Sequence, residues 1–137
     1  MVQVYFLLVI TNVLSGMVLA RSAWRGAPHP DLDAFLAIFH QKWGTGALGL
    51  VTFVTGFLGL IFVLPGDQVF LGDLIPSLTA LVAGTTLILE FYKKDSPERL
   101  ASTEKLDDVL LANKLIIGFL ALGFGILHFI LPQVVFL

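Results

Sequence analysis

Apolar residues dominate four stretches of the chain, and each stretch is long enough for a helix that crosses a bilayer. They cover roughly residues 2–20, 43–64, 68–92 and 110–131. A bilayer core of about 30 Å needs about 20 helical residues. The pattern therefore predicts an all-α integral membrane protein, in which residues 1–137 form a single domain of four transmembrane helices arranged as two helical hairpins.

Two polar connections, at about 21–42 and 93–109, separate the first span from the second and the third from the fourth. Each runs from basic residues through a proline (Pro30 or Pro97) into a stretch with apolar residues at helical spacing. Such amphipathic stretches are expected to lie along the membrane interface or to extend the next span. The link at residues 65–68 is so short that the second and third spans should pack side by side.

The two hairpins resemble one another in plan, and the resemblance has two interpretations. The second and fourth spans end in similar sequences at residues 62–65 and 129–132, each with a proline as its last residue. One interpretation is a hairpin duplicated in parallel orientation, and the other is the bias of an apolar composition. Both remain open at the level of the sequence.

The basic residues predict the orientation of these spans. All eight Lys and Arg residues lie within residues 21–42 and 93–114. Since positively charged loops stay in the cytoplasm, both connections are predicted to be cytoplasmic and both termini to lie on the opposite side. Arg21 and Arg25 follow the first apolar stretch, whereas a signal peptide carries its positive charge before it. The first stretch is therefore expected to be a retained span.

Composition agrees with the membrane class and excludes several functions. Hydrophobic residues make up 57% and charged residues 13% of the chain, whereas soluble domains carry about 25% charged residues. The lipid bilayer is thus the first predicted partner. A net charge of -2 with no basic stripe does not fit nucleic-acid binding. Because the chain has no cysteine, disulfides, thiolate chemistry and iron–sulfur clusters are excluded.

Small residues recur every three or four positions in the second and fourth spans, which places them on one helix face. In lipid, helices associate largely through close backbone approach along such faces. We therefore predict helix-packing faces that face either the other spans or a second protomer. Their residues are Gly49, Thr52, Gly56 and Gly59 in the second span and Gly118, Ala121 and Gly125 in the fourth.

Five polar residues on the spans form two predicted layers near the membrane surfaces. Tyr5, Asp73 and His128 form an outer layer, in which an Asp73–His128 hydrogen bond is expected. Glu90 and Lys114 form an inner layer and are expected to pair. The outer layer is interpreted as a structural pair or as a pH-sensitive or ion-binding mouth. The inner pair is interpreted as an orienting salt bridge or as two side chains that reach towards the headgroups.

The sequence offers little catalytic or cofactor chemistry. No charged residue lies near the predicted midplane, which weakens an ion-coupled transport function. His40 and His128 belong to opposite ends of the spans and cannot hold one haem iron together. The serines lack an activating base at the same depth, and no phosphate-binding glycine loop is present. No enzyme activity, metal site or cofactor is therefore identified.

Three functional hypotheses follow. The first is a small non-enzymatic membrane protein that forms a homo-oligomer or acts as an accessory subunit of a larger membrane complex through its glycine faces. The second is a small oligomeric channel or transporter, and the third is a binder of a lipid-soluble ligand (quinone, pigment, haem or lipid) between the second and fourth spans. The residues proposed to line the pathway of the second are Asn12, Thr52, Asp73, Glu90 and His128.

Overall fold

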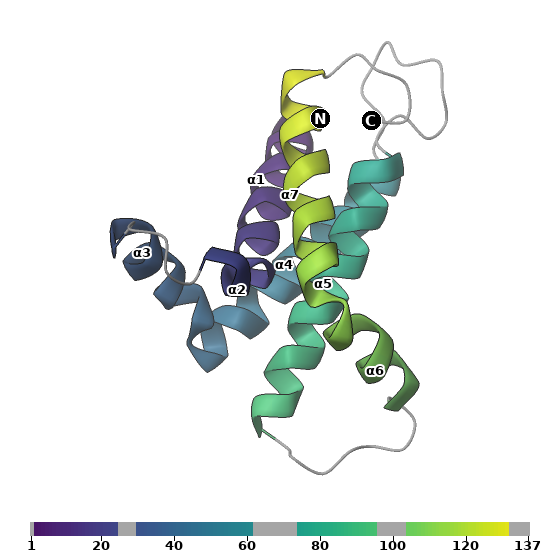
Figure 1. The fold of residues 1–137 in the computed structure, drawn as a ribbon. Coiled ribbons are helices and arrows are strands. Elements are labelled where there is room, and N and C mark those ends of the chain that lie inside the picture. The colour runs from purple at the N-terminus through teal and green to yellow at the C-terminus, as the bar shows by residue number, and fades with distance from the viewer. Residues whose placement is uncertain (1, 25–29, 62–73, 96–103, 132–137) are drawn as a thin grey trace.

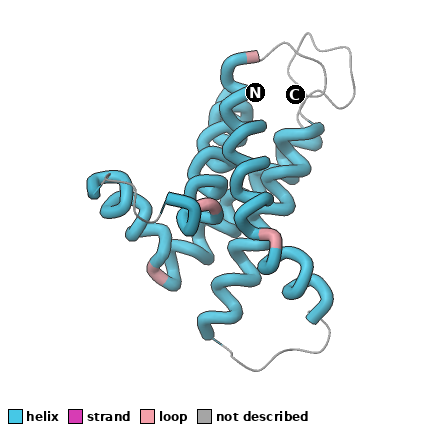
Figure 2. The backbone as a smooth tube through the Cα atoms, viewed as in Figure 1, coloured by secondary structure: helices cyan, strands magenta, loops and turns pink. Residues whose placement is uncertain are grey.

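A computed structural model of the chain describes residues 2–24, 30–61, 74–95 and 104–131. Within these ranges the backbone is helical apart from short breaks, and no strand is present (Figure 2). The all-α class predicted from the sequence is confirmed. The predicted turn at residues 65–68 lies outside the described residues.

Three helices are long and apolar enough to cross a membrane, and they coincide with the first three predicted spans. They are α1 (Val2–Leu19), α4 (Lys42–Ile61) and α5 (Leu74–Asp95). The fourth predicted span corresponds to a bent pair, α6 (Glu104–Ala112) and α7 (Lys114–Ile130), whose axes differ in direction by 60°. The described chain thus has three or four helices apolar enough to span a membrane, depending on whether the bent pair is one span.

The apolar stretch predicted as the fourth span, from residue 110, contains a break in the helix at Asn113. The backbone angles of Asn113 are φ -101° and ψ 14°, and its side-chain Nδ2 donates to the Val109 carbonyl over 2.7 Å. Asparagine is a poor helix former because its amide competes for backbone groups. A 3.8 Å ion pair between Lys93 and Asp107 also joins α6 to α5. Hydropathy alone does not register this break.

The four long helices form a bundle in which neighbours along the chain alternate in direction (Figure 1). α4 packs most extensively on α5, as predicted for the second and third spans, and α1 packs most extensively on α7. α1 also contacts α4 and α5, whereas α4 and α7 make no contact within the described residues. The predicted hairpins consist of the first and second spans and of the third and fourth spans. The α4–α5 pair and the α1–α7 pair therefore each join one hairpin to the other.

Glycines allow both of these helix pairs to approach backbone to backbone. A Cβ atom at Gly84 of α5 would lie 2.6 Å from the Phe53 nitrogen of α4. A Cβ atom at Gly118 of α7 would lie 2.7 Å from the Ala20 nitrogen beyond α1. The predicted small-residue faces are consequently buried between helices of the same chain, and they are not free to bind a second protomer. The buried residues are Gly49, Thr52, Gly56, Gly59, Gly118, Ala121 and Gly125.

Both polar connections contain the helices expected from their apolar spacing. α3 (Pro30–His40) follows the short α2 (Arg21–Trp24), and α6 precedes α7. α3 and α6 project to opposite sides of the bundle, at the end remote from the start of α1 (Figure 1). Leu36 anchors α3 in the core between α1 and α4. We call this end of the molecule the charged end, because all described Lys and Arg residues lie there.

Candidate functional site

Ion pairs connect the helices at the charged end. Each includes at least one partly exposed side chain, although Asp107 itself is buried, and ion pairs that remain open to solvent contribute at most about 1 kcal/mol. Glu90 and Lys114, predicted as one inner layer, are brought together with 3.4 Å between Oε1 and Nζ. The other pairs are Arg21–Asp33 at 3.3 Å, between α2 and α3, and Lys93–Asp107, between α5 and α6.

The junction between α3 and α4, which we call the α3 elbow, is held by hydrogen bonds to the last carbonyls of α3. The Thr45 hydroxyl donates to the Phe39 carbonyl over 2.8 Å. The Lys94 ammonium donates to the His40 carbonyl and to the Thr45 oxygen, both over 3.2 Å. The last carbonyls of a helix have no partner within the helix and carry its partial negative charge. A hydroxyl and a cation therefore stabilise the C-terminus of α3 against α4 and α5.

His40 lies in this elbow with its Nε2 atom buried, and that atom makes no hydrogen bond within the described residues. Burial lowers the pKa of His40 below its ordinary value, and Arg21 lowers it further. Lys94 and Lys114 act in the same direction, whereas the Glu90 carboxylate opposes them. The sequence analysis missed this site because it assigned His40 only to the end of the second span. The available signal was a histidine two positions before the basic Lys42.

Tyr5 and His128 lie together at the opposite end of the bundle. The Tyr5 hydroxyl donates to the His128 backbone carbonyl over 2.7 Å, and the ring centroids are 4.6 Å apart. His128 is fully buried. Asp73, the third member of the predicted outer layer, lies outside the described residues. Its hydrogen bond to His128 therefore stays a prediction.

A polar contact at mid-height joins α1 to α5. Asn12 is fully buried, and its Nδ2 donates to the Pro76 carbonyl over 2.9 Å. Its Oδ1 accepts from the Thr79 hydroxyl over 3.3 Å. The Thr52 hydroxyl, by contrast, donates within α4 to the Leu48 carbonyl over 2.7 Å. Two residues of the hypothetical transport pathway, Asn12 and Thr52, are thus hydrogen-bonded inside the bundle.

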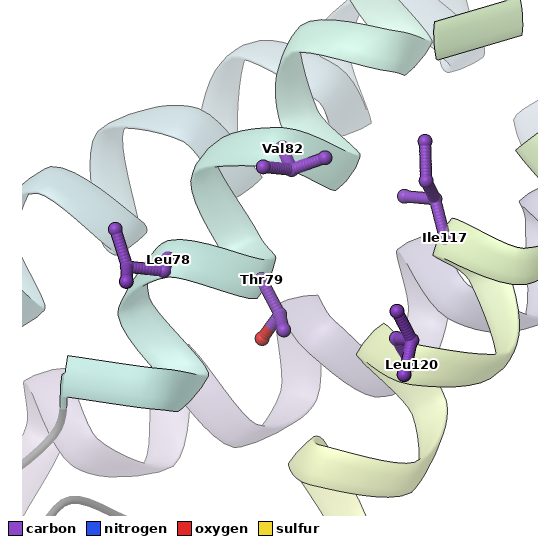
Figure 3. A pocket seen from close by; sticks show the side chains of 5 residues that line it. All are labelled: Leu78, Thr79, Val82, Ile117 and Leu120. Carbon is purple, nitrogen blue, oxygen red and sulfur yellow. The ribbon is translucent and has the colours of Figure 1, made fainter. Parts of the chain in front are cut away.

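The third hypothesis placed its ligand between the second and fourth spans, but within the described residues α4 and α7 are not in contact, and neighbouring helices lie against their buried glycines. A small groove instead lies between α5 and α7, with a volume of about 150 Å³ (Figure 3). Its lining is apolar apart from one hydroxyl. The lining residues are Leu78, Thr79, Val82, Ile117 and Leu120.

The described residues define an all-helical bundle with three or four helices apolar enough to span a membrane. They contain no group of three or more His, Asp or Glu side chains that could hold a metal ion. A protein-family model of unknown function matches residues 1–128, so the chain belongs to that family. No curated protein and no solved structure matches the chain.

Proposed function

We propose that the protein is a small non-enzymatic integral membrane protein that acts as an accessory subunit of a larger membrane complex. The observation that carries this proposal is that the small-residue faces are buried between helices of one chain. The bundle is complete by itself, and its mid-height polar groups, Asn12 and Thr79, hydrogen-bond to each other and to Pro76. Such a bundle needs no second copy to bury its own faces, and it offers its outer surface to other molecules.

The outer surface of the bundle supports a location in lipid. Large apolar side chains are exposed along α4, and such a surface would be costly in water and is solvated by acyl chains in a bilayer. These side chains are Leu50, Val51, Phe53, Val54, Phe57 and Ile61. Within the described residues, the predicted small-residue faces of α4 and α7 are buried inside the bundle. We therefore do not expect a partner to bind by close helix packing in the hydrocarbon.

The charged end offers a different surface, and we place the partner contact there. Phe35 and Ile38 of α3 are 46% and 59% exposed, on the helix that Asp33 ties to Arg21 by an ion pair. Exposed aromatic and aliphatic anchors are typical of protein interfaces. By the positive charge of its loops this end is expected on the cytoplasmic side.

Two exposed phenylalanines give a matched test of this proposal. A photo-crosslinking phenylalanine analogue is introduced at Phe35, on α3, or at Phe57, on the outer side of α4, where exposure is similar at 46% and 54%. After illumination of native membranes we expect a protein adduct of defined mass from position 35 and lipid adducts from position 57. Lipid adducts alone from both positions, together with a purified monomer that carries no bound protein, would contradict the proposal.

A transport function makes the opposite prediction. If the polar residues formed a pathway, the purified protein in liposomes would conduct ions or solutes, and Glu90→Gln would reduce the flux. Asn12 and Thr52 are instead hydrogen-bonded inside the bundle, which supports the absence of transport. We expect no flux above that of protein-free liposomes, for the natural chain and for the variant alike.

A further inference from the structure

His40 lies in the α3 elbow, the joint between α3 and α4. It is the last residue of α3, and α4 begins at Lys42. Lys94 donates a hydrogen bond to its carbonyl, and Thr45 donates one to the carbonyl of Phe39. Its Nε2 atom is buried in the same joint with no hydrogen-bond partner in the described part of the chain. An imidazole in this position is suited to the neutral state.

The charges around the imidazole come from three other helices. Arg21 of α2, Lys94 of α5 and Lys114 of α7 are cations, and Glu90 of α5 is the carboxylate that faces His40. This carboxylate already pairs with Lys114 at 3.4 Å. A protonated imidazole would therefore meet an excess of positive charge and would bury an N–H group without an acceptor. On release of α3, water would hydrate the charged ring.

We propose that His40 is an acid-sensitive latch, which keeps α3 docked on the bundle while its imidazole is neutral and releases the helix when the imidazole is protonated. Apart from this joint, α3 is held by the buried Leu36, by Leu32 and Phe39, which pack partly buried against the same core, and by the partly exposed ion pair between Asp33 and Arg21. A released α3 would carry its apolar side chains to the membrane interface, which solvates amphipathic helices. The latch does not depend on which partner the protein binds.

The direction of the pH dependence follows from proton binding. Burial first, and Arg21 second, lower the pKa of His40 in the docked state, whereas a released, hydrated histidine has a pKa of about 6.5. The released state therefore binds the proton more tightly. Docking is at full strength above about pH 6.5. Below that pH the equilibrium constant for docking falls by at most about tenfold per pH unit, until the docked histidine is itself protonated.

The absence of cysteine allows this equilibrium to be measured on the full chain. Spin labels are placed on Ala34→Cys of α3 and Gly123→Cys of α7, both at exposed positions. Distances between the labels are recorded in lipid nanodiscs from about pH 7.5 to about pH 5.5, a range in which carboxylates of ordinary pKa do not titrate appreciably. We expect one narrow distance distribution at the upper pH and a growing second population as the pH falls.

His40→Gln is expected to abolish this pH dependence, because glutamine cannot be protonated. His29→Gln is the matched control and should release α3 like the natural sequence. Thr45→Val should weaken docking at every pH and preserve the pH dependence, because it removes the hydrogen bonds of the Thr45 hydroxyl with Phe39, Gln41 and Lys94 and leaves the imidazole of His40 in place. An unchanged distance distribution of the natural sequence over the whole range would overturn the proposal, as would release of α3 from a folded His40→Gln variant.

Ring-labelled histidine provides a test that needs no substitution at His40. Its NMR signal should titrate together with the appearance of the second distance population. If the ring of His40 becomes protonated and the distances do not change, histidine protonation and α3 docking are uncoupled and the latch is wrong. This measurement decides the question even if His40→Gln does not fold.

Discussion

At the scale of single residues, two buried polar side chains of the bundle find their hydrogen-bond partners in different ways. Asn12 reaches from α1 to the Pro76 carbonyl of α5, whereas Thr52 returns its hydroxyl to its own helix. The sequence could predict that both residues lie near the middle of a span. It could not predict the partner of Asn12, because that choice depends on how the helices are rotated against each other.

Substitution of Asn12 should separate these two kinds of hydrogen bond. Asn12→Leu keeps the branching of the side chain, with a larger volume, and removes the bond between helices, so the free energy of unfolding should fall by about 1 kcal/mol, typical of such bonds in membranes. Thr52→Val removes a bond within one helix at an equally buried site and should cost less than about 0.5 kcal/mol. Unfolding titrations in mixed micelles measure both, and equal losses would contradict the assignment of Asn12 as the inter-helix contact.

At the scale of helices, the spacing of small residues predicted which faces are buried, since Gly118, Ala121 and Gly125 all lie inside the bundle. Hydropathy could not locate the break before α7. Apolar residues lie on both sides of Asn113, although Lys114 follows it directly, and the break depends on one amide and on the ion pair that turns α6 towards α5. The start of α7 therefore depends on local interactions of Asn113, which the apolar pattern does not show.

Two glycines of α7 provide a matched test of close packing. At Gly118 an added methyl group would lie 2.7 Å from the Ala20 nitrogen and 2.9 Å from the Gly16 carbonyl oxygen, whereas at Gly123 no atom lies within 4 Å. Gly118→Ala should therefore lower the free energy of unfolding by about 1–3 kcal/mol, through overpacking against backbone. Gly123→Ala should leave it unchanged or raise it by up to about 1 kcal/mol, through helix propensity. Thermal unfolding in detergent checks both, and similar values for the two variants would show that α1 and α7 are not in close contact.

At the scale of the whole molecule, the sequence predicted the number of apolar helices better than their neighbours. α4 beside α5 followed from a short connection, but the pairing of α1 with α7 and the separation of α4 from α7 did not. The second and fourth predicted spans carried small-residue faces of similar spacing, so several arrangements satisfied the pattern equally well. The choice among them is made by backbone contacts such as those of Gly84 and Gly118, which join residues far apart in the chain.

The charge distribution of the whole molecule makes a prediction about its orientation in the proposed membrane. The described basic residues all lie at the charged end, and the start of α1 lies at the other end (Figure 1). Because loops rich in Lys and Arg stay in the cytoplasm, we expect Gln3→Cys to react with a membrane-impermeant thiol reagent added outside intact cells. Ala112→Cys, equally exposed on α6, should react only after the membrane is permeabilised. Reversed labelling would show that the orientation is inverted, and labelling of both sites in intact cells would show that the helices do not separate two compartments.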